Sequence, residues 1–136
     1  MTNIVYFARE FIVNNVISTV KFETTAQITK NLNELMISYQ EPLEDRACCN
    51  IYYNGNSLIE IIRVSGNLRN KFKIIKGKFV SNNYNTLSGV TELSTFGNEI
   101  SVTSLKNQTQ VLKFNYNLYQ NYDLVNSHQI YLQIKE

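Results

Sequence analysis

Between Cys48 and Glu136 the chain reads as a series of short β-hairpins. Segments in which apolar and polar residues alternate are separated at close intervals by residues that favour tight turns. Alternation with a period of two is typical of a strand with one buried and one exposed face. Glycine and asparagine tolerate the positive φ that tight turns need, and Asn-Gly is the strongest signal for a type I′ hairpin turn. The predicted turns are Asn54-Gly55, Ser65-Gly66-Asn67, Lys76-Gly77-Lys78, Gly97-Asn98 and Lys106-Asn107-Gln108.

The N-terminal third follows the same pattern with longer intervals. From Val20 to Ile28 apolar residues and threonines alternate with polar residues, and Asn14-Asn15 and Asn31-Leu32-Asn33 are turn candidates. Residues 40–45 form the one clear loop, because they hold the only proline and proline cannot donate to a central ladder. We expect strands over 4–13, 20–28, 35–39, 47–53, 57–64, 71–75, 79–86, 90–96, 99–105, 109–119 and 129–134.

These short connections predict an all-β fold. Sequential strands joined by short turns pair with one another, which gives an antiparallel up-and-down meander. A meander this long exposes sheet edges that invite aggregation unless it closes on itself. We therefore expect a closed or nearly closed barrel of roughly eight to ten strands, which has room for a packed core or one small ligand. With 136 residues and no internal linker, the chain is predicted to form one domain over residues 1–136.

Charge and hydropathy restrict the partners. The chain holds 13 basic and 11 acidic residues, interleaved along its length, for a formal net charge of +2. No massed basic footprint for nucleic acid stands out. Arg9 and Glu10 interrupt the N-terminal apolar stretch, which therefore does not match a secretory signal, and no run is long enough for a membrane helix. We expect a cytoplasmic protein with no membrane insertion.

Three elements of the sequence resemble the YwiB-type family of small bacterial proteins. Arg63-Val64-Ser65-Gly66 looks like that family's arginine-then-glycine turn, and Tyr84-Asn85-Thr86 followed by Gly89 resembles its tyrosine-threonine-glycine element. Residues 90–96, 114–118 and 130–135 follow its closing strands, and the resemblance covers residues 51–136, about two thirds of the chain. It implies a calycin-like, or lipocalin-like, β-barrel and implies no activity. Leu87 and Ser88 stand where the family has a proline and an aromatic residue, which would alter a binding lip at this turn.

Three residues are candidates for a ligand cavity. Arg63 continues the face of Ile59 and Ile61 in a strongly apolar strand. If that face lines the barrel interior, the guanidinium needs an anionic partner, supplied by the protein or by a ligand. Tyr84 and Thr86 share a strand face and could present hydroxyls to the same cavity. The alternative places Arg63 at the rim, with its stem packed and its head in water.

Other chemistry is weakly supported. His128 is the only histidine, and a zinc site would need ligands at suitable spacing; we expect it to be exposed beside the last turn. Cys48 and Cys49 should point to opposite faces of a strand, so a small buried hydrophobe and a thiol on the other face are favoured over a redox pair. The acidic cluster Glu41, Glu44 and Asp45 is expected to be solvated. We assign no catalytic, cofactor or metal residues.

Two functions remain open. The first is a non-enzymatic barrel that binds a small apolar, amphipathic or anionic ligand in its interior, by burial of apolar surface plus a few fixed polar contacts. The second is a module that binds protein or single-stranded nucleic acid through the outer face of the barrel. The four lysines 71, 73, 76 and 78, interleaved with Phe72 and Phe79, are the best hint of nucleic-acid binding, but an amphipathic edge hairpin shows the same pattern. An enzyme is the third choice.

Overall fold

Ten antiparallel strands build the whole described structure. The computed structural model describes residues 2–105 and 109–135, so the predicted turn at residues 106–108 lies outside the described residues. No helix occurs within these ranges. The strands are β1 (Thr2–Ile12), β2 (Asn15–Asn31), β3 (Glu34–Gln40), β4 (Cys48–Tyr53), β5 (Leu58–Ser65), β6 (Leu68–Ile75), β7 (Phe79–Thr86), β8 (Gly89–Ser104), β9 (Gln110–Gln120) and β10 (Asp123–Lys135).

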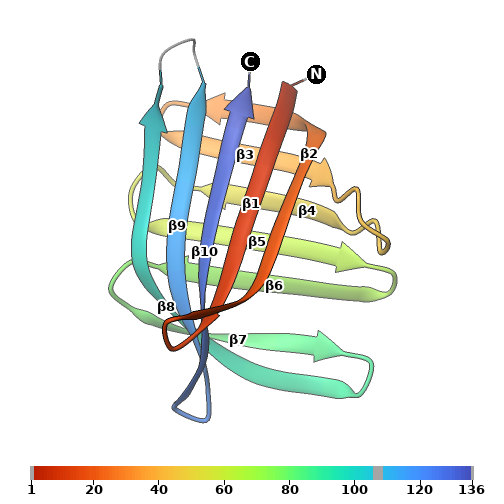
Figure 1. Ribbon diagram of the computed structural model, residues 1–136, viewed down its shortest axis with the longest axis vertical. Coiled ribbons are helices and arrows are strands. Elements are labelled where there is room, and N and C mark those ends of the chain that lie inside the picture. Colours follow the sequence, from red (N-terminus) through yellow and green to blue (C-terminus); the bar gives the residue numbers. More distant parts are fainter. Residues whose placement is uncertain (1, 106–108, 136) are drawn as a thin grey trace.

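The strands form one sheet that curls into a nearly closed barrel. Their order is β6-β5-β4-β3-β2-β1-β10-β9-β8-β7. Every strand therefore pairs with its sequence neighbours except β6 and β7, which are the two edges of the sheet. The N- and C-terminal strands also pair, with Asn3 opposite Lys135. In Figure 1 the long strands β1, β9 and β10 lie close to vertical across the front, with β10 antiparallel to the other two, while β3 to β6 run crosswise behind them. The predicted all-β meander barrel is confirmed.

The core fills the space between these two layers. Its side chains come from alternate positions of the front strands, such as Ile4, Phe114 and Leu132, and of the rear strands, such as Ile37 and Ile59. All five are fully buried. The alternating residues of each strand therefore lie with one face inward, as predicted. Burial of these apolar side chains is the main force that stabilises the barrel. Side chains occupy the centre, which agrees with the packed core, one of the two contents that the sequence left open.

Asparagine side chains complete the barrel between its two edge strands, β6 and β7. The backbone N–H of Lys73 donates to Asn82 Oδ1 over 2.9 Å, and the N–H of Asn85 donates to Asn70 Oδ1 over 2.6 Å. Asn70 Nδ2 donates in return to the Asn85 carbonyl over 3.1 Å. Amide groups in this way satisfy edge donors and acceptors that would otherwise be left unpaired. We call this junction the seam.

The predicted turn at Gly97-Asn98 is wrong. The two strands expected on either side of it form one strand, β8, with a bulge between Gly97 and Glu99. Gly97 forms an isolated bridge with Lys76, and its carbonyl accepts a hydrogen bond from the N–H of Gly77 over 2.8 Å. A Cβ at Gly97 would lie 2.6 Å from the carbonyl oxygen of Ile75. Glycine is needed here for close backbone approach, which a sequence pattern does not distinguish from a turn.

Two further turns differ in detail from the prediction. Asn54-Gly55 does lie in a hairpin connection, but the connection has four residues and Asn54 Oδ1 accepts hydrogen bonds from the N–H groups of Asn56, Ser57 and Leu58. Two consecutive residues with positive φ, which a type I′ turn requires, occur instead at Asn121 and Tyr122 between β9 and β10.

Candidate functional site

The open end of the barrel carries the candidate site. The β3–β4 loop, the β5–β6 turn and the β7–β8 turn all lie on the same side of the molecule (Figure 1). The β3–β4 loop follows the predicted segment around Pro42. It is closed by a hydrogen bond from the Glu41 N–H to the Ala47 carbonyl over 2.8 Å and by one from Gln40 Nε2 to the Arg46 carbonyl over 3.2 Å. These contacts fix the position of Glu41 at the edge of the core.

Arg63 forms a two-pronged ion pair with Glu41. Nη2 of Arg63 lies 2.9 Å from Oε1 of Glu41, and Nε lies 3.3 Å from Oε2. The Arg63 side chain is 43% exposed, whereas that of Glu41 is only 12% exposed. The hydrogen bond to Glu41 raises the pKa of Arg63 above its ordinary value. Arg63 lies opposite Cys49, a buried residue, so its face of β5 is the interior face and its anionic partner comes from the protein itself.

The expectation that the acidic loop cluster is solvated is wrong for Glu41 and right for its neighbours. Glu44 and Asp45 are exposed, while Glu41 turns inward. The thiol of Cys49 donates to Glu41 Oε2 over 3.3 Å. The role of Glu41 was missed in the sequence because Glu41 lies close to the exposed residues Glu44 and Asp45 and was assigned to the same solvated cluster. The only available signal was the unpartnered Arg63, which called for a carboxylate somewhere in the fold.

A group of buried aromatic and sulfur side chains lies beneath the ion pair. Tyr6 stacks on Phe22 with ring centroids 4.8 Å apart, and Tyr39 lies 6.3 Å from Tyr6. Burial raises the pKa of both tyrosines, and it raises the pKa of Cys49 to about 12. The thiol is therefore protonated at neutral pH and acts as a hydrogen-bond donor, not as a nucleophile. Cys48 is exposed on the opposite face, as alternation predicted.

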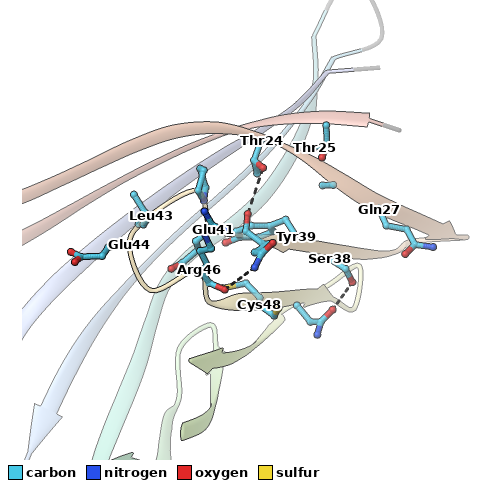
Figure 2. Close-up of a pocket in the computed structure, with 15 residues that line it drawn as sticks. Thr24, Thr25, Gln27, Ser38, Tyr39, Glu41, Leu43, Glu44, Arg46 and Cys48 are labelled. Atoms are coloured by element: carbon cyan, nitrogen blue, oxygen red, sulfur yellow. Dashed lines mark hydrogen bonds between the residues drawn. The ribbon is translucent and has the colours of Figure 1, made fainter. Parts of the chain in front are cut away.

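A hollow of about 970 Å³ opens beside this group, under the β3–β4 loop. Figure 2 shows Thr24, Tyr39, Glu41 and Leu43 around it. Its wall combines hydroxyl, amide and carboxylate groups with apolar surface. The lining residues are Thr24, Thr25, Ala26, Gln27, Ser38, Tyr39, Gln40, Glu41, Pro42, Leu43, Glu44, Arg46, Cys48, Cys49 and Asn50.

The three predicted cavity residues do not line this hollow. Arg63 reaches it only through Glu41. Tyr84 packs on Phe72, with ring centroids 5.7 Å apart. Thr86 stabilises the β7–β8 turn, where its hydroxyl donates to the Gly89 carbonyl over 2.9 Å. The structure does bring the three residues toward the same end of the barrel. Arg63 stands opposite Asn70 in the β5–β6 pairing, and Asn70 bonds to Asn85 of β7. Tyr84 and Thr86 are the two sequence neighbours of Asn85.

His128 is not exposed beside a turn. It lies within β10, half-buried, and its ring stacks on Tyr116 at 4.8 Å. Its Nε2 lies 2.9 Å from Asn126 Oδ1. Burial lowers the pKa of His128, which favours the neutral ring. The strand starts earlier than predicted because the Asn121-Tyr122 turn lies farther from the C-terminus than the sequence suggested. Across residues 2–105 and 109–135, no three histidine, cysteine or acidic side chains gather closely enough to hold a metal ion.

Residues 9–132 match the family described as domain of unknown function DUF1934. The chain belongs to the DUF1934 family. Among solved structures it is similar to the ywiB protein from Bacillus subtilis, with 16% identity and a TM-score of 0.78 over 98% of this chain and 89% of that one. No curated protein matches the chain.

The match to the DUF1934 family confirms the family resemblance seen in the sequence. At 16% identity the likeness to the Bacillus subtilis protein shows the fold alone. Within the described ranges no helix is long and apolar enough to cross a membrane. Function in this family member therefore has to be argued from the side chains at the open end.

Proposed function

We propose that the protein is a non-enzymatic binding protein for a small amphipathic molecule, which it takes into the hollow beneath the β3–β4 loop. The observation that carries this proposal is that the hollow, of about 970 Å³, borders both the Glu41 carboxylate and the apolar surfaces of Ala26, Tyr39 and Leu43. A concave site with apolar walls and a few fixed polar groups is the usual arrangement for small-molecule binding. Its volume is in the range of known ligand sites.

The charges around the hollow favour an uncharged ligand over an anion. The sequence left open whether the anionic partner of Arg63 comes from the protein or from a ligand, and Glu41 fills that role. Glu41 and Glu44 line the hollow together with one cation, Arg46. Beside the hollow, Arg63 pairs with Glu41 and lies 3.9 Å from Asp45, so acidic groups still exceed basic ones by one. An anion would meet net repulsion there, whereas a hydroxyl or amide could donate to Glu41.

Arg63 acts in this proposal as a positioning residue. Its guanidinium holds the Glu41 carboxylate in one orientation through two hydrogen bonds, so the carboxylate is pre-organised before a ligand arrives. Tyr84 and Thr86 lie at the same end of the barrel as this pair, next to Asn85, which bonds to Asn70 opposite Arg63. Direct contact between a ligand and either residue stays a prediction.

Two dyes with the same ring skeleton test this proposal. N-phenyl-1-naphthylamine is uncharged, and 1-anilinonaphthalene-8-sulfonate adds one sulfonate. We expect the uncharged dye to bind more tightly in a fluorescence titration. Leu43→Glu places a charge in the hollow and should abolish binding, while Leu87→Glu, at an exposed turn outside it, should leave binding unchanged. Equal binding by the wild type and both variants would show that the dye sits elsewhere and would refute the proposal.

A protein-interaction role is the second candidate, because exposed apolar residues gather at two hairpin tips. The β1–β2 tip exposes Val13 at 79%, with Ile12, Val16 and Ile17 about half exposed, and the β9–β10 tip exposes Leu124. Both tips lie at the lower end in Figure 1. Large exposed apolar areas mark interaction surfaces. Sedimentation velocity should show self-association that weakens in Val13→Asp; a monomer at all concentrations counts against this role.

A further inference from the structure

A second hollow lies on the outer face of β7, β8 and β9, far along the sheet from the β3–β4 loop. It measures about 570 Å³ and is lined by Phe79, Glu92, Ser94, Tyr119, Asn121 and Tyr122. The pairing register explains why these side chains share a face: Ser94 stands opposite both Ser81 of β7 and Tyr119 of β9. Three aromatic rings and one carboxylate therefore surround a single concave space.

The aromatic rings are arranged to offer surface to a guest. Phe79 packs edge-on against Tyr119, with ring centroids 5.3 Å apart, and its ring centroid lies 4.8 Å from that of Phe96. Phe79 nevertheless remains 65% exposed. The electron-rich faces of phenylalanine and tyrosine attract organic cations.

Tyr122 is the least expected member of the group. It is fully exposed, and it has a φ of 68° beside Asn121 at 51°. Turn chemistry favours glycine at the second central position of such a turn, since a bulky residue at positive φ is strained. Neither the turn nor packing accounts for a tyrosine here, and strained residues of this kind gather at functional sites.

Glu92 supplies the negative charge. Its Oε1 accepts a hydrogen bond from the Ser81 hydroxyl over 2.8 Å, and within the described part of the chain no lysine or arginine forms an ion pair with it. The Ser81 contact fixes the carboxylate without neutralising it. A carboxylate beside aromatic faces is suited to a positively charged group that is too bulky and weakly hydrated to prefer water.

From this geometry we propose that the outer hollow binds a small organic ammonium cation, of the quaternary ammonium class. The rings contact the methyl or methylene groups of the cation, and Glu92 balances its charge. The site is separate from the hollow under the β3–β4 loop and does not depend on the function proposed for it.

Choline and its uncharged isostere 3,3-dimethylbutan-1-ol provide the direct test. Both have the same shape, so a difference between them isolates the charge. We expect choline to shift the NMR signals of Phe79 and Tyr119 on titration and to bind at least about tenfold more tightly than the isostere. Equal binding of the two, or no shift with choline at millimolar concentration, would overturn the proposal.

Two substitutions assign the binding to this hollow. Glu92→Gln keeps the size of the side chain and should lower the affinity for choline at least about tenfold. Glu99→Gln, on the same strand but outside the hollow, should leave the affinity for choline unchanged. Tyr122→Gly creates the preferred Asn-Gly turn, so it should raise the melting temperature. Because it also removes an aromatic ring, it should lower the affinity for choline at least about fivefold. A more stable variant that binds choline as well as the wild type would exclude Tyr122 from the site and contradict the proposal.

One further arm separates a free cation from a cation carried by a protein. A short peptide containing trimethyllysine presents the same ammonium group on a chain. Comparable binding of choline and the peptide, or tighter binding of choline, supports a small-molecule site. Binding of the peptide alone would refute the small-molecule assignment and identify a protein partner.

Discussion

The Arg63–Glu41 ion pair joins two residues with unequal burial, and this inequality predicts unequal effects of removing them. Arg63→Met would leave the Glu41 carboxylate, 12% exposed, with only the Cys49 thiol as a donor among its described contacts, and should lower the free energy of unfolding by about 2 kcal/mol. Glu41→Gln leaves the Arg63 side chain unpaired but accessible to water, so it should lower the free energy of unfolding by about 1 kcal/mol or less. Urea unfolding of the two variants measures the difference; a larger loss for Glu41→Gln would contradict this account of the pair.

His128 predicts a pH dependence of stability. Burial lowers its pKa below the ordinary value of 6.5, with the charge of Glu10 acting in the opposite direction. The unfolded chain therefore binds a proton at a higher pH than the folded chain does. The stabilising contribution of the neutral ring is complete above pH 6.5 and is lost as the pH falls below it.

The measurement is the free energy of unfolding between pH 7.5 and 5, for the wild type and for His128→Phe. Phenylalanine keeps an aromatic ring against Tyr116 and cannot titrate. We expect the wild type to lose stability more steeply than the variant, by up to about 1.4 kcal/mol per pH unit. If the free energy of unfolding fell equally steeply with pH in both proteins, His128 would not contribute to the pH dependence of stability.

At the level of the strands, the bulge in β8 controls how the barrel closes. Gly97→Ala would place a Cβ 2.6 Å from the carbonyl oxygen of Ile75, so the backbone of β6 or β8 would have to move. We expect a loss of at least about 2 kcal/mol in the free energy of unfolding. Gly66→Ala is the matched control: nothing lies within 4 Å of its Cβ, and only its φ of 59° opposes the change, at about 1 kcal/mol. Equal losses for the two variants would show that the close approach at Gly97 is unimportant.

The strands also show where sequence patterns lose information. Alternation identified nearly every strand because one face of each is buried against the core. The alternation pattern wrongly predicted two strands in place of β8, because glycine followed by asparagine is compatible with either a turn or a bulge. It also began β10 too late, because residues 123–128 at the base of that strand are not alternately buried. Both differences depend on contacts with other strands, and neither is encoded locally.

For the molecule as a whole, the seam is the predicted point of least stability. Across it β6 and β7 are held by amide side chains, and one isolated bridge joins Lys76, just after β6, to Gly97 of β8. By contrast, β1 pairs with β10 over nine residue pairs. Strands with fewer ladder hydrogen bonds open at lower free energy. Native-state hydrogen exchange should therefore show β6 and β7 exchanging before β1, β9 and β10.

Asn82 makes this prediction specific. It is buried, and its Oδ1 accepts the Lys73 N–H across the seam. Asn82→Ala should accelerate exchange over β6 and β7 and lower the free energy of unfolding by about 2 kcal/mol, while Asn83→Ala, on the exposed face, should change neither. Earlier exchange in β1 or β10 than at the seam would contradict this picture of the barrel.

The sequence by itself determined the fold class, the meander and the loop around Pro42, because each of these follows from local turn chemistry or from a period of two in hydrophobicity. Only the tertiary structure decided which carboxylate neutralises Arg63, how side chains rather than a backbone ladder complete the barrel, and where the hollows lie. These features join residues such as Glu41 and Arg63, or Asn82 and Lys73, from different strands. Such pairings arise from the curl of the sheet, and the spacing of residues along a single strand carries no record of them.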